Sequence, residues 1–423
     1  MIEACIKEDP NKRPSFDEIV EQLKNDQAFI TNTINEDEYR KYISYIDCRI
    51  QSNIKKEETK PTPKFEDNFR SLKEETKIEE EEEEEEENDE EEEEEEQEED
   101  DDEYEESNEN YYNDEFIDID VNPKINLSLY NKKRCIGQGS YGKVYKVTEK
   151  TKNENNQVYA AKIFSMKEND QTSKIENIKR EIILHSRFSH PLIVKFIGYS
   201  PVNFEKRSQS VIMLEYLRKG SLLNIMKKMQ IQNCVLEWTD TKKLISIYGI
   251  ASAMKYLHSR GIIYRNLNPE NILLDNSYYP KLSDFSLSID ENANIENEKN
   301  VVGTAKYIAP EIWESKIYTK ASDVYAFGIL VYEMITNKNP YEGYENVQIV
   351  YKVCIQNSRP KIDKNVSDCY KQLISSCWDQ DPSKRPTFEE ILSKLKKDPK
   401  FTTEDVDSDE YHKYVDFIDH FHN

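Results

Sequence analysis

The sequence predicts an α+β, bilobal protein: a small antiparallel β-sheet with one helix, followed by a larger helical lobe. From about Leu127, apolar and β-branched residues alternate between glycine turns, which is typical of a small antiparallel sheet. From Ser221 onward the pattern changes to longer helices, notably over residues 241–260. A highly acidic stretch precedes both lobes and predicts a disordered linker.

The charge of the 423-residue chain is concentrated toward its N-terminus. Residues 1–124 carry 47 acidic and 15 basic side chains, a net charge of −32, whereas the remaining residues carry a net charge of +6. Residues 74–120 alone hold 32 acidic side chains and one lysine. Such a block repels itself and has too little apolar surface to offset the entropy of ordering. It could bind a basic protein or act as a solvated spacer, and we favour the spacer.

The cysteines and the apolar segments bear on where the protein works. Seven cysteines occur without a Cys-x-x-Cys pair, which suits a reducing compartment. A run of about eighteen apolar residues, long enough to span a membrane, is absent, as is the apolar core of a secretory signal. We therefore expect a cytoplasmic protein, with the nucleus as the alternative, that binds neither membrane nor nucleic acid.

The first fifty residues repeat the last fifty. Residues 5–47 align without a gap with residues 377–419, and Asp9-Pro10-Asn11-Lys12-Arg13-Pro14 matches Asp381-Pro382-Ser383-Lys384-Arg385-Pro386. A terminal helix cannot bury its apolar face without the lobe beneath it. Residues 1–50 are therefore interpreted as the end of an upstream copy, either in a truncated chain or as a remnant. The alternative is a free helical hairpin that docks elsewhere in this chain.

These observations divide the chain into four parts. Residues 1–50 form the N-terminal repeat, and residues 51–123 form a disordered linker that contains the acidic run 74–120. Residues 124–398 form the two-lobed domain, and residues 399–423 form a helical C-terminal tail.

A glycine-rich loop, a lysine and a glutamate follow one another in the sheet-rich part. Gly137, Gly139 and Gly142 form a Gly-x-Gly-x-x-Gly loop, with Val144 two residues after its last glycine. Lys162 ends a short apolar strand, and Glu181 lies nineteen residues later in a helical pattern. The loop joins two strands rather than a strand and a helix, which disfavours a dinucleotide-binding fingerprint.

Three further motifs follow in the helical part: Tyr264-Arg265-Asn266-Leu267-Asn268-Pro269-Glu270-Asn271, Asp284-Phe285-Ser286 and Ala309-Pro310-Glu311. Their order and spacing resemble the protein-kinase signature set. With Asp323, Cys377-Trp378 and Asp381-Pro382, the sequence is most similar to the tyrosine-kinase-like group of Ser/Thr-type kinases. The resemblance covers residues 127–395 and implies a bilobal protein-kinase fold.

The resemblance implies a site for ATP and Mg²⁺. Lys162 is expected to contact the α- and β-phosphates and to pair with Glu181, and the glycine loop is expected to approach the phosphates. Asp284 and Asn271 are expected to hold Mg²⁺. The adenine side of the site is implied for Ile136, Val144, Ala160, Leu273 and the hinge residues Glu215 and Leu217.

The sequence departs from the family where the phosphoryl group is transferred. Asn266 replaces the aspartate that accepts the proton of the substrate hydroxyl, and Asn268 replaces a lysine. Arg265 is kept and is expected to receive a phosphate or carboxylate from the activation segment. Thr304 lies in a segment that resembles a substrate-docking loop of Ser/Thr-directed kinases. Ser286, in place of glycine, is expected to affect how Phe285 packs.

Three functions are compatible with this pattern. The first is a pseudokinase that binds ATP and acts as a scaffold or allosteric partner of a true kinase. The second is an active Ser/Thr kinase with reduced turnover, in which Asn266 only orients the substrate hydroxyl. The third places the function in the acidic run, as an interaction tail for a basic protein.

Overall fold

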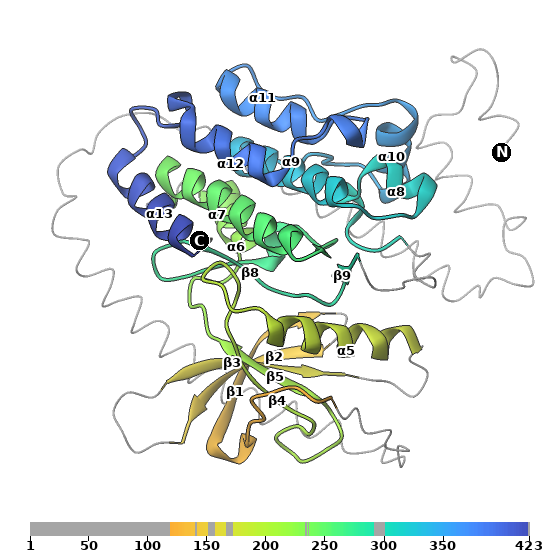
Figure 1. Ribbon diagram of the computed structural model, residues 1–423, viewed down its shortest axis with the longest axis vertical. Helices are drawn as coiled ribbons and strands as arrows, with labels where there is room; N and C mark the ends of the chain where they lie inside the picture. Colours follow the sequence, from red (N-terminus) through yellow and green to blue (C-terminus); the bar gives the residue numbers. More distant parts are fainter. Residues whose placement is uncertain are drawn as a thin grey trace, which may run out of the picture. The chain divides into compact units, whose positions relative to one another are not determined.

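The computed structural model describes residues 119–139, 142–150, 157–165, 172–232, 235, 237–291 and 301–421. These residues form a small sheet-rich lobe and a larger helical lobe (Figure 1). The predicted α+β, bilobal fold class is confirmed. The predictions made for the N-terminal repeat and for the acidic run up to residue 118 lie outside the described residues.

The described residues of the small lobe form one antiparallel sheet and one α-helix. The sheet order is β1-β2-β3-β5-β4, and α5 lies between β3 and β4 along the chain. The elements are β1 (Tyr130–Gly139), β2 (Gly142–Glu149), β3 (Val158–Phe164), α5 (Thr172–Arg187), β4 (Phe196–Ser200) and β5 (Val211–Glu215).

Alternation along β3 sorts its side chains onto two faces of the sheet. On one face Phe164 packs with Ile212 of β5 and with Ile178 and Ile182 of α5. On the opposite face Ala161 and Ile163 belong to a second cluster with Val147, Val211 and Met213. Because Lys162 lies between Ala161 and Ile163, it is directed to the face that carries α5.

The folded lobe begins earlier than the predicted boundary at residue 124. Ile119 and Val121 are buried in the cluster of α5, and Asp120 between them is exposed. Acidic residues surround this short alternating pattern, so composition alone assigned it to the linker. The linker prediction is therefore wrong for residues 119–123.

The helical lobe is built around two buried helices, α7 and α9. Both are apolar on nearly all sides, as expected for helices enclosed by others. Thr239 caps α7 by accepting a hydrogen bond from the backbone N–H of Lys242. The helices are α6 (Leu222–Gln232), α7 (Asp240–Ser259), α8 (Pro310–Ser315), α9 (Lys320–Thr336), α10 (Asn346–Val350), α11 (Asp368–Cys377), α12 (Phe388–Lys397) and α13 (Ser408–His420).

Short elements connect these helices and carry the loops of the site. Strand β6 (Ile262–Ile263) pairs with β9 (Ile289–Asp290), and β7 (Ile272–Leu274) pairs with β8 (Pro280–Leu282). A π-helical turn, η7 (Tyr351–Ile355), follows α10. Five 3₁₀ turns complete the described elements: η4 (Leu127–Leu129), η5 (Pro269–Asn271), η6 (Ala305–Tyr307), η8 (Pro382–Lys384) and η9 (Pro399–Phe401).

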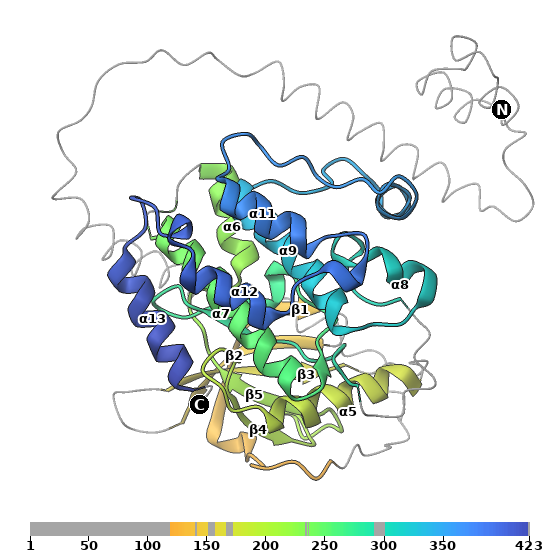
Figure 2. The same ribbon diagram turned by 45° about the horizontal axis from the view of Figure 1, so that its top comes forward.

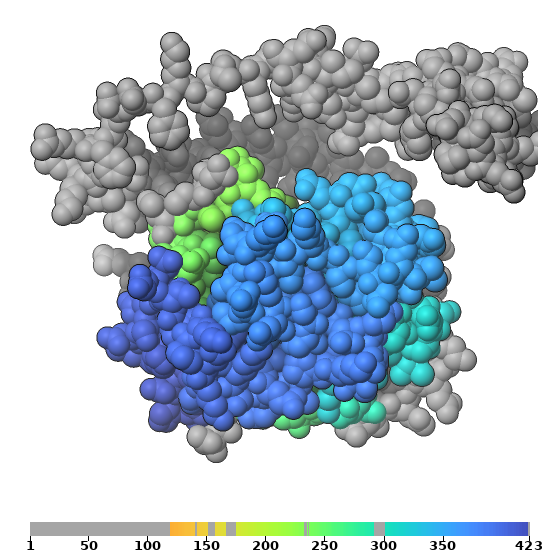
Figure 3. Space-filling model, turned by 90° about the horizontal axis from the view of Figure 1, so that it is seen from above, coloured from red at the N-terminus to blue at the C-terminus, as the bar shows by residue number. Residues whose placement is uncertain are grey.

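The C-terminal tail forms helix α13, which packs along α7 (Figure 2). Tyr411, Tyr414 and Ile418 are buried against the lobe. Asp419 accepts a hydrogen bond from the hydroxyl of Tyr248 at 2.8 Å. In the space-filling view the tail, in dark blue, lies closely against the side of the helical lobe (Figure 3). Across the part of the chain that the structure describes, no helix is long and apolar enough to cross a membrane.

We predict that Gly142→Ala destabilises the small lobe, whereas Gly139→Ala does not. Gly142 has a φ of +151°, and an added Cβ would lie 2.0 Å from the carbonyl oxygen of Ile163. A Cβ at Gly139 would meet nothing within 4 Å. Urea unfolding should show a loss of about 2 kcal/mol or more for the first variant and less than about 0.5 kcal/mol for the second. Equal losses would contradict this account of the loop.

We also predict that His185 makes the fold sensitive to acid. Burial lowers the pKa of His185 to about 4, although its Nε2 hydrogen-bonds the carbonyl of Val194 at 2.7 Å. Because the folded-state pKa lies below the unfolded value of about 6.5, the stabilisation is complete above pH 6.5 and is lost as the pH falls toward 4. The loss from this group amounts to about 3 kcal/mol.

The variant His185→Gln keeps an N–H donor for Val194 and removes the titration. Urea unfolding between pH 7 and 4 should therefore show a flatter decline in stability for this variant than for the parent. His412→Gln, on the exposed side of α13, is the matched control and should decline as the parent does. Parallel curves for all three proteins would show that His185 is not the group responsible.

Candidate active site

Lys162, Glu181 and Asp284 form a cluster between the sheet, helix α5 and the loop after β8. Lys162 Nζ lies 2.5 Å from Glu181 Oε1 and 3.6 Å from Asp284 Oδ1. Burial alone would lower the pKa of Lys162, but the carboxylates of Asp284 and Glu181 raise it. Burial alone would raise the pKa of Asp284, but Lys162 and the hydrogen bond that the backbone N–H of Ser286 donates lower it. At neutral pH the site therefore holds a cation beside an ionised carboxylate.

Glu181 is the most enclosed member of this cluster. It is 1% exposed, and burial raises its pKa to about 7 against the opposing effect of Lys162. A carboxyl group in such surroundings is stable as an ion only while its lysine partner stays in place. By holding Glu181 next to Lys162, the position of α5 therefore favours the ionised form of Glu181.

Phe285 packs deep between the two lobes. It is fully buried, and its ring lies 5.0 Å from the ring of His185, 5.1 Å from Phe188 and 5.6 Å from Tyr264. The residue after it, Ser286, does not have a positive φ, so the Cβ that replaces the family's glycine causes no backbone strain in this arrangement. The effect of Ser286 on how Phe285 packs stays a prediction.

A buried carboxylate from α9 holds the loop that contains Asn266. Asp323, 1% exposed, accepts hydrogen bonds at 2.9 Å from the backbone N–H groups of Tyr264 and Arg265, and its Oδ2 lies 2.9 Å from His258 Nε2. Arg265 has a φ of +63°, an unfavourable value for a residue with a side chain. The hydrogen bonds that Asp323 accepts offset this strain and fix the start of the loop.

Three asparagine amides occupy the middle of the loop. Asn268 Nδ2 donates to the backbone carbonyl of Asn266 at 3.0 Å and to Asn266 Oδ1 at 3.2 Å. Asn268 Oδ1 accepts from the backbone N–H of Glu270 at 2.9 Å and caps η5. Asn271 Nδ2 also donates to the carbonyl of Asn266, at 2.9 Å. The two positions that the family fills with an aspartate and a lysine thus hold a neutral, mutually bonded pair.

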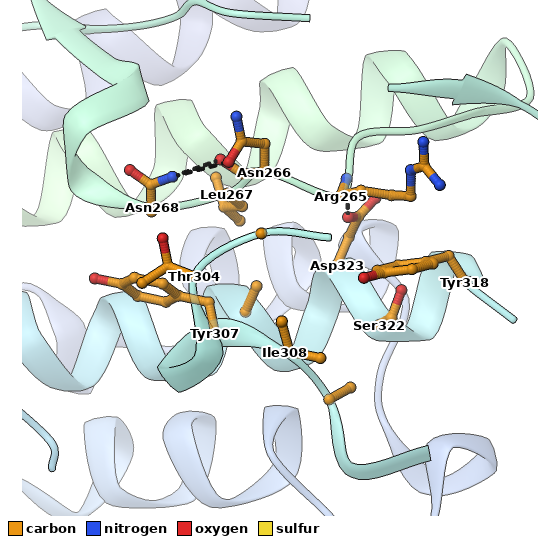
Figure 4. Close-up of a pocket in the computed structure, with 13 residues that line it drawn as sticks. Arg265, Asn266, Leu267, Asn268, Thr304, Tyr307, Ile308, Tyr318, Ser322 and Asp323 are labelled. Carbon is orange, nitrogen blue, oxygen red and sulfur yellow. Dashed lines mark hydrogen bonds between the residues drawn. The ribbon is translucent and has the colours of Figure 1, made fainter. Parts of the chain in front are cut away.

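Arg265 and Thr304 lie on opposite sides of a small pocket that Asn266 and Asn268 also line (Figure 4). Arg265 Nε donates to the carbonyl of Leu287 at 2.5 Å, and its guanidinium lies 5.1 Å from the centre of the Tyr318 ring. Among the described residues, Arg265 therefore contacts the carbonyl of Leu287, which lies in the activation segment, and the ring of Tyr318, which follows that segment. Thr304 is exposed, and Figure 4 shows its side chain directed toward the asparagine loop.

The residues expected on the adenine side come from both lobes. Ala160 is buried, and the other four are partly or largely exposed apolar side chains. Ile136 lies on β1, Val144 on β2, Ala160 on β3, Leu217 just after β5 and Leu273 on β7. Cross-strand pairing places Val144 beside Lys162. Partly exposed apolar side chains next to a half-buried cation suit a ligand with a flat apolar part and an anionic part.

Glu215 does not direct its carboxylate to this region. The carboxylate accepts from Lys281 Nζ at 2.7 Å and from the backbone N–H of Lys195 at 2.7 Å. Any contact of Glu215 with a ligand must therefore involve its backbone. Sequence analysis missed Lys281, whose position in β8 carried no motif to indicate this pair.

The residues present fit ATP and Mg²⁺. Asp284 supplies an ionised carboxylate, and Asn271, whose amide nitrogen is engaged, can offer its amide oxygen. Among the described residues, no group of three or more His, Cys, Asp and Glu side chains is arranged to hold a metal ion. Protein sites that bind Mg²⁺ commonly use one or two carboxylate ligands and complete the coordination with phosphate oxygens and water. Asp284 and Asn271 would hold a metal ion that arrives with a nucleotide.

Comparisons with known proteins agree with this geometry. The family described as "Protein kinase domain" matches residues 130–395. Serine/threonine/tyrosine-protein kinase HT1 of Arabidopsis thaliana is 34% identical over 240 residues, which cover 57% of this chain and 59% of HT1.

Two other relatives show similar identity over the same part of the chain. Serine/threonine-protein kinase CTR1 of Arabidopsis thaliana is 31% identical over 284 residues, 66% of this chain and 32% of CTR1. The probable serine/threonine-protein kinase drkC of Dictyostelium discoideum is 31% identical over 275 residues, 64% of this chain and 35% of drkC. The alignments thus cover between about a third and three fifths of these relatives. With its fold, its motifs and this match over more than half of its length, the chain belongs to the protein kinase superfamily and is similar to the tyrosine-kinase-like group.

Proposed function

We propose that this protein is a nucleotide-binding pseudokinase that acts in intracellular signalling as a scaffold or as an allosteric partner of a true kinase. The observation that carries the proposal is the contrast between two neighbouring parts of one site. The charged cluster of Lys162, Glu181 and Asp284 is assembled, whereas the pair of Asn266 and Asn268 is neutral.

The charged cluster supports binding of ATP with Mg²⁺. Lys162 can neutralise phosphate oxygens, and Asp284 and Asn271 can hold the metal ion that accompanies them. A bound nucleotide would bring a divalent cation into the environment of Asp284, whose depressed pKa keeps it ionised. These groups act on the ground state as well as on the transition state, so they permit binding without transfer.

The neutral pair argues against efficient phosphoryl transfer. The amide of Asn266 can orient a substrate hydroxyl but cannot take up its proton, and loss of a general base typically costs about 10²–10⁴-fold in rate. Asn268 brings no positive charge to the phosphoryl group being transferred. Loss of such a charge commonly lowers the rate by roughly a further 10²–10³-fold. The two losses need not add, because groups that act as a unit are non-additive.

An active Ser/Thr kinase with a reduced rate is the second candidate. The packing of Phe285 and the ion pair of Lys162 favour it, because both belong to an assembled site rather than a collapsed one. Relatives of this chain are named as serine/threonine kinases. Phosphoryl transfer depends largely on positioning, so a chain with this geometry can retain some activity.

We predict that Asn266→Asp creates or strongly increases phosphoryl transfer in the full chain. The variant restores a carboxylate at the position that faces the substrate hydroxyl, and the rate should rise at least about 10²-fold. Transfer of radiolabelled γ-phosphate from Mg-ATP to the chain itself and to a mixture of Ser- and Thr-containing peptides measures the effect.

Two variants serve as controls for this assay. Asp284→Ala removes the expected metal ligand and defines the background, and Asn276→Asp makes the same chemical change in an exposed turn. The pseudokinase proposal requires that the parent does not exceed the Asp284→Ala background. Parent activity that disappears in Asp284→Ala would instead establish the second candidate.

We also predict that Lys162→Met weakens nucleotide binding by about 10–100-fold, the loss expected for a charge-assisted hydrogen bond. Thermal-shift titrations with ATP and Mg²⁺ measure this when each variant is compared with its own nucleotide-free melting temperature. Lys338→Met removes an exposed ion pair with Asp363 in the helical lobe and should bind nucleotide as the parent does. A Lys162→Met protein with parental affinity would refute the proposed site.

A further inference from the structure

Residues 119–126, which we call the strap, precede η4 and run along the edge strand β4 (Figure 2, orange). The backbone N–H of Ile125 donates to the carbonyl of Tyr199 at 2.9 Å, and the N–H of Tyr199 donates to the carbonyl of Pro123 at 2.9 Å. Lys124 Nζ donates to the carbonyl of Ile119 at 3.1 Å and lies 5.2 Å from the centre of the Tyr199 ring.

The fit between the strap and β4 is close. A Cβ added at Gly198 would lie 2.4 Å from Cγ2 of Ile125 and 2.8 Å from the carbonyl oxygen of Pro123. Glycine at this position therefore leaves the space that the strap fills. The strap is therefore packed into the small lobe and is not an extension lying on its surface.

The first residues of the strap complete the contact between α5 and the sheet. Ile119 and Val121 are 6% and 5% exposed and share one cluster with Ile178 and Ile182 of α5. Phe164, Tyr199 and Ile212 supply the sheet side of this cluster. Without the two strap side chains, α5 would lose part of the apolar surface that holds it against the sheet.

The α5 residues in this cluster stand next to Glu181. Ile178 lies one helical turn before Glu181, and Ile182 follows it directly. A rotation or outward movement of α5 would therefore change the contact of 2.5 Å between Glu181 and Lys162. The same position of α5 thus accounts for both the apolar cluster with Ile119 and Val121 and the ion pair of Glu181 with Lys162.

We propose that Ile119 and Val121 are positioning residues for nucleotide binding, because they hold α5 where Glu181 meets Lys162. This inference rests on the proposed nucleotide site and adds to it a contact made by the segment that precedes residues 130–395, the part that matches the protein kinase domain. Removing the two apolar side chains should allow α5 to move, so that Lys162 loses its partner and is less well placed for phosphates.

The test uses the full chain with Ile119→Ser and Val121→Ser combined. Nucleotide affinity, measured by titration with ATP and Mg²⁺, should weaken at least about fivefold, the lower end of coupling between distant groups. Hydrogen exchange should become faster in residues 172–187 of α5 and stay unchanged in residues 240–259 of α7. Ile119→Val with Val121→Ile keeps an apolar cluster and should restore parental affinity, and Leu129→Ser, at an exposed apolar side chain, is the matched control.

A double-mutant cycle with Glu181→Gln separates positioning from general destabilisation. If the strap acts through Glu181, the strap variant should weaken affinity by less than about twofold when Glu181→Gln is already present. The same fivefold loss in both backgrounds, or unchanged exchange in α5, would overturn the inference.

Failure of the proposed site is distinguishable from failure of this inference. A parent chain that does not bind nucleotide, or one whose affinity is unchanged by Lys162→Met and Glu181→Gln, would refute the nucleotide site. The exchange of α5 amides would still report whether the strap holds the helix. Slow exchange retained in the strap variant would then overturn the positioning role as well.

Discussion

The ion pair between Lys162 and Glu181 is the interaction on which the rest of the structure depends. It joins β3, the middle strand of the small lobe, to helix α5, in surroundings where an unpaired charge would cost about 3–5 kcal/mol. The apolar cluster around Ile178 and Ile182 sets the helix position that the pair requires. The pair in turn leaves Lys162 within 3.6 Å of Asp284, which links the small lobe to the loop after β8.

A second buried carboxylate performs the corresponding task in the helical lobe. Asp323 fixes the backbone at Tyr264 and Arg265, so the loop keeps its shape without the charges that other kinases place at its centre. The amides of Asn268 and Asn271 then replace an ionic arrangement with hydrogen bonds to Asn266. The loop therefore takes its shape from Asp323 and from amide hydrogen bonds, and it does not require an aspartate at position 266 or a lysine at position 268.

Much of this arrangement could be predicted from the sequence. The two lobes and the pairing of Lys162 with Glu181 follow from motifs whose spacing is fixed by the fold. Other features depend on contacts that no motif reports. The sequence shows that Asn268 stands where the family has a lysine. Its hydrogen bonds with the backbone N–H of Glu270 and with Asn266 could not be predicted, because they depend on the geometry of the turn. The burial of Ile119 and Val121 was hidden because the surrounding acidic residues dominate the local composition.

The burial pattern of the C-terminal copy also bears on the N-terminal repeat. Phe388, Ile391, Leu395, Tyr411, Tyr414 and Ile418 are buried, and the repeat has Phe16, Ile19, Leu23, Tyr39, Tyr42 and Ile46 at the matching positions. Arg385, which binds Glu311 through two contacts of 2.7 Å, is matched by Arg13. A helical hairpin that folds alone does not need a complete set of core residues. It also does not need an arginine whose counterpart, Arg385, pairs with a residue of another element. In the described lobe that surface is already covered by α12 and α13. That residues 1–50 come from a second lobe of the same kind, rather than forming a hairpin that docks on this one, stays a prediction from this sequence match.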